Sequence, residues 1–328
     1  MHLNNKDSFV IYRHPKSDDL FYIKGEWQTI NKFKKSNSFI FSPFKGETQE
    51  IIGIKKNIKQ KISISNDIIQ NTSTFSKEQY INLAKEYIGL CKNKAIEKII
   101  LSRVRVAENK TSDLFLLFEK LCNTYDHSFN YVLNHPNYGM WMGASPEVLI
   151  TNSNNNSYKT IALAGSKKWG NNIVWGNKEI EEQQYVKVYI ENILNNHSKN
   201  VQCTNDLETI KAGNIAHLKS TFHFSLNSSV FNLIQDLHPT PAVCGIPMKI
   251  TKDLIQKHEI HNRELYTGYI GEQNHTSTSL YVNLRCMKIT SNKFSIYVGG
   301  GITSKSDPQE EWEETEIKAQ TMLSLIEN

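Results

Sequence analysis

The sequence predicts an α+β fold in which antiparallel sheets carry helices on their outer faces. Short apolar or β-branched runs occur in pairs across turns, as at residues 129–133 and 140–142, which flank the turn-forming segment Asn-His-Pro-Asn-Tyr-Gly. Amphipathic helices interrupt these pairs without regular β-α-β alternation. No Pro/Gly/Ser-rich linker divides the chain near its middle. We therefore expect a single domain over residues 1–328, with a strand-rich part at 1–70 and the main body at 71–328.

The predicted elements follow one another along the chain. Strand-like runs lie at residues 9–12, 20–23, 39–41 and 51–54, ahead of an amphipathic helix at 76–90. Ser76 is a suitable cap for that helix, and Glu78 lies in its first turn. Strands are then expected at 98–106, 147–151, 158–164, 280–289 and 294–298, and helices at about 111–121, 178–194 and 308–326.

The C-terminal segment is the most informative stretch of the chain. The β-branched run at 294–298 stops at three glycines, and Asp307 and Pro308 then have the residue types of a helix cap and a first helical residue. Glu311, Glu314 and Lys318 follow at helical spacing. Taken alone, this segment is typical of a glycine turn followed by a solvated helix with one Glu314–Lys318 ion pair.

The composition excludes several classes of protein. A content of 39% hydrophobic and 22% charged residues is typical of a globular protein. The net charge is +5, and the basic residues do not form the stripe that nucleic-acid binding requires. Its five cysteines are dispersed and form no CxxC pair, which argues against a disulfide framework or a zinc site. No apolar run is long enough for a membrane span or a signal peptide. We expect a cytoplasmic protein without nucleic-acid or membrane partners.

Eight short motifs identify a family. They are KIILSR (98–103), GASPE (143–147), ALAGS (162–166), EEQQYV (181–186), HL (217–218), HPTPA (238–242), LRC (284–286) and the glycine–helix segment at 298–318. This series resembles the chorismate-utilising enzymes, most closely their isochorismate synthase branch, from about residue 70 to the C-terminus. The resemblance implies an anthranilate synthase component I-like fold, with a central sandwich of large antiparallel sheets. It also implies a monomer that converts chorismate to isochorismate without a redox cofactor or a glutaminase subunit.

By this resemblance, Lys98 and Glu147 are the catalytic pair. Lys98 would be the general base that activates water for attack at C2, and Glu147 the general acid that protonates the departing C4 hydroxyl. These roles need environments that lower the pKa of the lysine and raise that of the glutamate. Each residue alone is also typical of an ordinary strand end.

A metal site is expected at the long helix. Apolar residues follow Glu182 at i+4, i+7 and i+11, which places its carboxylate on the inward face of the helix, where an unpaired charge is costly. Glu179 and Glu181 have the spacing of surface charge. The resemblance pairs Glu182 with Glu314 as ligands of Mg²⁺, with Glu311 as a possible further ligand.

The remaining motif residues are expected to bind the substrate. Arg285, placed inside the strand at 280–289, can hold a carboxylate through two hydrogen bonds, and glycine amides can approach a ligand closely. His217 is expected to be a hydrogen-bond donor, whereas His238 has the character of a buried, satisfied histidine. The full set of expected substrate-binding residues is Gly165, Ser166, His217, Ala242, Arg285, Gly299 and Lys318.

Three alternatives remain open at this point. A salicylate synthase would share Lys98 and Glu147 but also eliminate pyruvate, and only Ser166 favours the simpler reaction. An anthranilate or aminodeoxychorismate synthase departs further from the motifs at 143–147 and 238–242. A non-catalytic chorismate-binding protein would be expected to have lost one of the catalytic or metal residues. The sequence leaves the pathway, menaquinone or siderophore, undecided.

Overall fold

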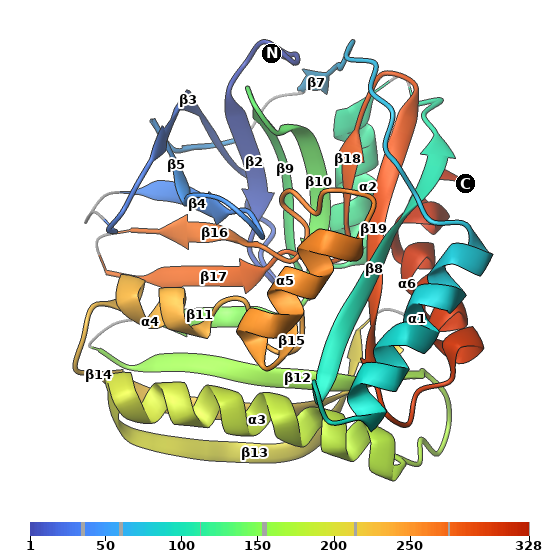
Figure 1. Cartoon of the computed structure of the whole chain (residues 1–328). Helices are drawn as coiled ribbons and strands as arrows, with labels where there is room; N and C mark the ends of the chain where they lie inside the picture. Colours follow the sequence, from blue (N-terminus) through green and yellow to red (C-terminus); the bar gives the residue numbers. More distant parts are fainter. Residues whose placement is uncertain are drawn as a thin grey trace.

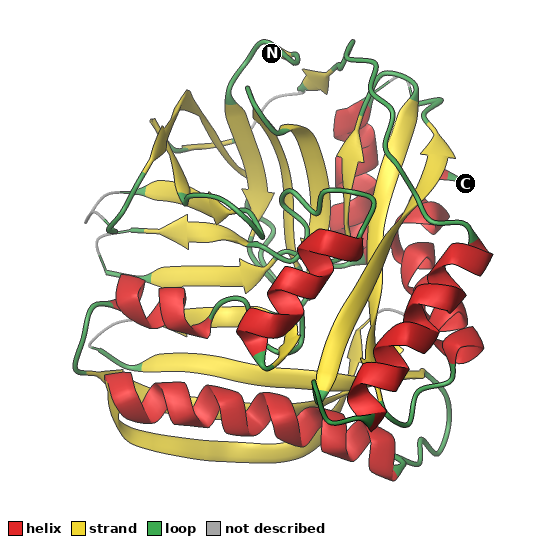
Figure 2. Cartoon of the chain, in the orientation of Figure 1, coloured by secondary structure: helices red, strands yellow, loops and turns green. Residues whose placement is uncertain are grey.

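Two antiparallel sheets joined by one shared strand form the body of the protein (Figure 1). The structure is a computed structural model that describes residues 1–33, 37–58, 62–111, 113–152, 156–212, 215–274 and 276–327. Strand β3 (Phe21–Thr29) belongs to both sheets: its first half pairs with β2 and its second half with β5. The N-terminal strands therefore take part in both sheets. Helices cover the outer faces (Figure 2), which confirms the predicted α+β fold.

The first sheet contains the strand that begins at Lys98. Its order is β15 (Gly245–Ile246), β8 (Lys98–Glu108), β19 (Lys293–Thr303), β18 (Cys286–Ile289), β10 (Gly139–Ser145), β9 (Phe129–His135), β2 (Phe9–Arg13), β3 and β6 (Lys56–Asn57). A separate parallel pair joins β1 (His2–Leu3) to β7 (Ser63–Ile64).

The second sheet shares β3 with the first and contains strands from both the N-terminal and the C-terminal parts of the chain. Its order is β13 (Ser198–Ala212), β14 (Ile215–Leu226), β12 (Tyr158–Lys168), β11 (Val148–Asn152), β17 (Thr278–Val282), β16 (Tyr269–Gln273), β4 (Ser38–Ser42), β5 (Gln49–Gly53) and β3.

Aromatic side chains fill the space between the sheets. Phe129 of β9 stacks on Tyr281 of β17 with ring centroids 4.6 Å apart, so the contact crosses from one sheet to the other. Trp141 and Tyr297 form a second aromatic pair in the same core. Burial of such rings contributes a large share of the stability of a sandwich core. The two sheets are thereby held at a fixed separation.

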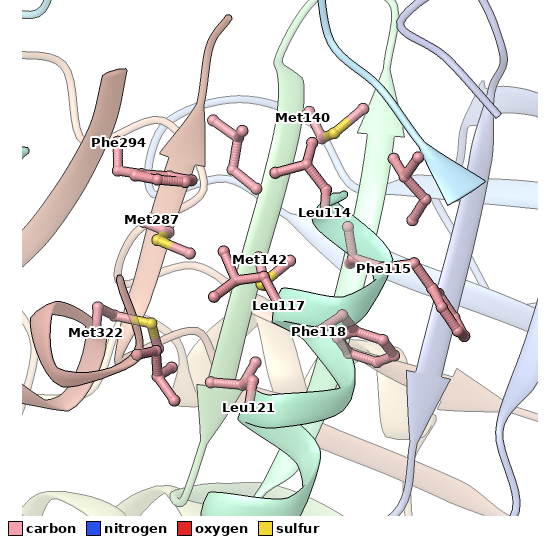
Figure 3. Packing of buried hydrophobic residues seen from close by; sticks show 14 of the residues in the cluster. Leu114, Phe115, Leu117, Phe118, Leu121, Met140, Met142, Met287, Phe294 and Met322 are labelled. Atoms are coloured by element: carbon pink, nitrogen blue, oxygen red, sulfur yellow. The ribbon is translucent and has the colours of Figure 1, made fainter. Parts of the chain in front are cut away.

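Helices bury the outer faces of both sheets. On the first sheet, α2 (Leu114–Thr124) packs over β9, β10 and β18, and Met322 of α6 (Pro308–Ile326) joins the same cluster (Figure 3). On the second, α3 (Asn177–His197) runs along β12 and β13 (Figure 1), and α4 (Val230–Leu237) extends that layer. Helices α1 (Lys77–Lys92) and α5 (Met248–His258) pack beside β8. Over the described residues, no helix has both the length and the apolar character needed to span a bilayer.

The predicted helices are close to the observed ones. Helix α6 has the expected bounds, and Asp307 accepts hydrogen bonds from two amides of its first turn. Ser76 caps α1, with Gln79 as the reciprocal partner of the capping box. Glu179 is a correction: it caps the N-terminus of α3 through the Gly176 amide and is largely buried, so it is not a surface charge.

Two predicted strands are wrong in their bounds. The run at 280–289 is two strands, β17 and β18, because the chain crosses from the second sheet to the first between them. Arg285 lies in that crossing with a positive φ of 48° and is therefore not inside a strand. Strand β19 does not stop at the glycines but continues through them to Thr303, paired with β8 throughout. The sequence prediction also omitted β13, β14, β16, α4 and α5.

Candidate active site

One cavity gathers most of the residues expected to act on or bind a substrate. It has a volume of about 700 Å³ including its mouth and lies where β8 and β19 meet β12, β14 and the β17–β18 crossing. Ten of the expected residues line it: Lys98, Glu147, Gly165, Ser166, Glu182, His217, Ala242, Arg285, Gly299 and Lys318. Residues that lie far apart in the sequence are thus brought to one place by the pairing of the strands.

Lys98 lines the cavity and is fully buried. Its Nζ atom is 2.7 Å from Oε1 of Glu182, which reaches it from α3. Gly301 makes this contact possible, because a Cβ atom at that position would lie 2.7 Å from the Glu182 carboxylate and 3.0 Å from Cε of Lys98. The partner of the inward-facing carboxylate is therefore a lysine of β8, and glycine is needed where the two side chains meet over β19.

Glu147 lies between β10 and β11 and is 4% exposed. Burial raises its pKa from 4.5 to about 8, although the positive charges of Lys98 and Arg285 act in the opposite direction. A carboxyl group with this pKa keeps its proton at neutral pH. Glu147 therefore has the protonation state that a general acid requires.

Arg285 presents a cation to the same cavity. Burial lowers the pKa of its guanidinium from 12.5, while Tyr266 and Glu314 act to raise it. Within the described ranges, no hydrogen bond or ion pair of its guanidinium is seen. A half-buried guanidinium that lines a cavity without a protein partner among the described residues is suited to bind a carboxylate through two hydrogen bonds.

Another part of the cavity wall is formed by Gly165, Ser166 and His217. Gly165 has a φ of 69°, and a Cβ atom there would lie 3.1 Å from the Glu179 carbonyl oxygen of α3. The register of β12 against β14 shifts at this glycine, as in a β-bulge. The bulge turns the Gly165 carbonyl towards Nδ1 of His217, 3.0 Å away.

This contact determines the tautomer of His217. A carbonyl oxygen can only accept, so Nδ1 carries the hydrogen, and burial lowers the pKa of His217 to about 3, with the positive charges of Arg285 and Lys318 acting in the same direction. The ring is therefore neutral, and Nε2 is an acceptor. His217 is placed to accept a hydrogen bond from a hydroxyl group, rather than to donate one as expected from the sequence.

The HPTPA segment contributes Ala242 to the cavity wall. His238 of the same segment is a structural residue, as expected: its Nε2 atom is 2.8 Å from the Thr267 carbonyl oxygen, and burial lowers its pKa to about 4. Tyr266 and Thr267, which the sequence prediction did not include, also line the cavity. No motif in the sequence pointed to them.

Glu311 and Glu314 do not line the cavity but lie beside it on α6. Glu314 pairs with Lys318 at 2.5 Å, and Lys318 also donates to the Gly299 carbonyl oxygen at 2.9 Å. Glu311 is 1% exposed and pairs with Lys178 of α3 at 2.6 Å. Burial and the neighbouring charge of Glu314 raise the pKa of Glu311, whereas the charge of Lys178 and its hydrogen bond act in the opposite direction and favour the ionised carboxylate. Strand β18 pairs with β19 only as far as Tyr297, so the glycines that follow have no neighbouring strand on that side. This leaves the Gly299 carbonyl oxygen free to accept from Lys318.

These carboxylates have the chemistry of a site for a hard divalent cation. Glu182, Glu311 and Glu314 supply oxygen donors only, which suits Mg²⁺ rather than a softer metal. Among the described residues, no three acidic, His or Cys side chains are gathered tightly enough to hold a metal ion as they stand. Two or three of these carboxylates, completed by substrate oxygens and water, fit the usual Mg²⁺ arrangement once their lysine partners move away.

The sequence prediction missed Lys178 altogether. Its spacing of i, i+4 from Glu182 on a predicted helix was a usable signal, because such pairs lie on one face. The structure adds that Lys178 bridges α3 to Glu311 of α6.

Comparison with known proteins places the chain in a family. The chorismate binding enzyme family matches residues 26–327. The chain is 24% identical to isochorismate synthase EntC of Escherichia coli K12 over 326 residues, 95% of this chain and 78% of the relative. The structure of MenF, the menaquinone-specific isochorismate synthase of Escherichia coli, matches with a TM-score of 0.80 and 18% identity, covering 98% of this chain and 88% of that one. Anthranilate synthase component I of Streptococcus pneumoniae matches with a TM-score of 0.72 and 16% identity, covering 96% and 89%. The chain belongs to the chorismate binding enzyme family.

Proposed function

We propose that this protein is an isochorismate synthase that converts chorismate to isochorismate. The observation that carries the proposal is that Lys98 and Glu147 line one cavity, where burial raises the pKa of Glu147 to about 8. The exchange of two hydroxyl positions on one ring requires an acid and a base in the same cavity. The relatives named above as isochorismate synthases support the assignment.

In the proposed reaction, Lys98 acts from its neutral amine form and takes a proton from water as the water oxygen bonds to C2. The ring double bonds shift, and the C4–oxygen bond breaks as Glu147 gives its proton to the leaving hydroxyl, which departs as water. Lys98 ends with one proton more and Glu147 with one fewer, so proton return through solvent restores both. Arg285 and Lys318 would bind the substrate carboxylates, and Nε2 of His217 would accept from a ring hydroxyl.

The reaction is proposed to depend on Mg²⁺. Glu182 and Glu314 would hold the ion, with Glu311 beside them. When bound, it would supply positive charge that holds the ring carboxylate of the substrate.

Product analysis tests the proposal. Purified protein is incubated with chorismate and Mg²⁺, and the products are separated and identified. We expect isochorismate, formed reversibly and without ammonia or a second subunit. Pyruvate released in step with chorismate loss would instead assign a salicylate synthase, and anthranilate or aminodeoxychorismate formed with ammonium would assign the aminating branch. No turnover despite chorismate binding would indicate a non-catalytic binding protein.

A further inference from the structure

Three carboxylates surround the proposed metal region, and each has its own lysine. The pairs are Glu182 with Lys98 at 2.7 Å, Glu311 with Lys178 at 2.6 Å, and Glu314 with Lys318 at 2.5 Å. Lys98 and Lys318 line the substrate cavity, where the proposed reaction uses both. Lys178 does not line the cavity and has no part in the proposed chemistry. Its presence beside a buried carboxylate therefore needs another explanation.

Lys178 places a cation against the buried carboxylate of Glu311. It is the second residue of α3, and its Nζ atom donates to Oε1 of Glu311. Burial acts to lower the pKa of Lys178, but the charges of Glu311, Glu314 and Glu182 together raise it to about 12. Glu311 is in direct contact with this ammonium group at 2.6 Å, whereas Glu314 and Glu182 act on it through their charge. That group compensates the charge of Glu311, which is almost fully buried.

Lys178 is also the lysine most able to leave. Its side chain is 24% exposed, compared with 0% for Lys98 and 13% for Lys318. A long, partly exposed lysine side chain can turn its ammonium group to water at small cost. A divalent ion bound by the same carboxylates would repel an ammonium group left in place.

We propose that Lys178 is a resident counter-ion of the metal region, which holds Glu311 until a divalent cation binds and is then displaced into solvent. This inference rests on the Mg²⁺ dependence proposed above. Lys178 is a positioning residue in this role: it keeps buried carboxylates compensated, and it weakens cation binding because the ion must displace it. The chain would thereby avoid an unpaired buried charge at the expense of some metal affinity.

The test compares Lys178→Met with a matched control, Lys305→Met. Lys305 pairs with Glu181 at 2.6 Å in the same part of the molecule, but both side chains are about half exposed. Binding of Mg²⁺ to chelator-stripped protein is measured by calorimetry, and the melting temperature is measured with and without Mg²⁺. We expect Lys178→Met to bind Mg²⁺ roughly 3- to 10-fold more tightly than the wild type. Its melting temperature should be lower in chelator and should rise more on Mg²⁺ addition. Lys305→Met and the charge-conserving Lys178→Arg should match the wild type.

The outcomes separate this inference from the metal assignment. If Lys178→Met binds Mg²⁺ with unchanged or weaker affinity than the wild type, Lys178 supports the ligand Glu311 instead of competing with the metal, and the inference is overturned while Mg²⁺ dependence stands. If neither protein binds Mg²⁺, alone or with chorismate, the metal assignment and the inference both fail.

Discussion

The protonation of Glu147 gives the reaction a specific pH dependence. Burial raises the pKa of this carboxyl group to about 8, so it can give up a proton at neutral pH but has already lost it at alkaline pH. We expect turnover to fall as the pH rises through about 8. Glu147→Gln should lower kcat by roughly 10²-fold or more, because an amide cannot protonate the leaving group. Initial rates between pH 6 and 9.5 check this. If the slow Glu147→Gln variant shows the same fall in rate above pH 8, the fall belongs to the titration of another group.

The same residue predicts a pH-dependent stability. The unfolded chain releases the Glu147 proton near pH 4.5, whereas the folded chain keeps it to about pH 8. The folded state binds more protons in this window, so the free energy of unfolding falls as the pH rises across it. Glu147→Gln removes the effect. Its stability relative to the wild type should rise between pH 5 and 8, by up to roughly 3 to 5 kcal/mol. Denaturant titrations at both pH values measure the difference, and a constant difference would contradict the raised pKa.

Lys98 has both a structural and a catalytic role, and the two can be separated. Lys98→Met leaves the Glu182 carboxylate without its partner, so we expect a loss of about 3 kcal/mol in stability and roughly 10²-fold or more in kcat. The double variant Lys98→Met/Glu182→Gln should regain most of the stability but stay inactive, because it lacks both the proposed base and a proposed metal ligand. Urea unfolding and steady-state rates give the two readouts. Activity that recovers together with stability would show that Lys98 is structural only.

At the scale of elements, the sequence predicted helices and cavity residues better than strand ends. Caps such as Asp307 and Ser76 are local signals, because their side chains bond to amides two or three residues away. The break at Arg285 has no such signal. It arises because the chain crosses from one sheet to the other, which depends on contacts between distant segments. The continuation of β19 through its glycines likewise depends on pairing with β8, which overrides the low strand preference of glycine.

The tautomer of His217 and the partners of the three carboxylates were beyond sequence reasoning for a similar reason. Each depends on a contact between elements far apart in the chain: β12 with β14 for His217, α3 with β8 for Glu182, and α3 with α6 for Glu311. The motifs showed which residues would share a cavity. Only the fold shows which atoms face one another, and the roles of donor, acceptor and ion-pair partner follow from that.

The glycine end of β19 provides a test at the same scale. A methyl group added at Gly301 would lie 2.7 Å from the Glu182 carboxylate, so Gly301→Ala should force Lys98 and Glu182 apart. We expect a fall in kcat of at least 10-fold, with the strand itself retained because β8 still pairs with it. The control is Gly89→Ala in α1, where no atom lies within 4 Å of the added methyl group. It should gain about 0.5–1 kcal/mol in stability and leave the rate unchanged. A fully active Gly301→Ala would show that this close approach is dispensable.

At the scale of the whole molecule, the proposed metal links elements that belong to different layers. Glu182 lies on α3, which covers the second sheet, and Glu314 lies on α6, which covers the first. A cation held by both carboxylates would therefore join the two halves of the sandwich, and it would stabilise the folded state because the unfolded chain has no such site. At a Mg²⁺ concentration ten times the dissociation constant, the gain is about 1.4 kcal/mol.

This predicts a metal-dependent melting temperature. Chelation should lower the melting temperature of the wild type by about 2 °C and abolish turnover, and both should return when Mg²⁺ is restored. Glu182→Gln should lose the stabilisation by Mg²⁺ together with activity. Glu181→Gln is the matched control, because Glu181 directly precedes Glu182 on α3 but is half exposed and pairs with Lys305. This variant should keep both its activity and its stabilisation by Mg²⁺. Thermal melts in chelator and in Mg²⁺ measure the shift for all three proteins. Full activity in excess chelator, or an undiminished Mg²⁺ shift in Glu182→Gln, would mean that the two halves of the sandwich are not joined by a metal at Glu182.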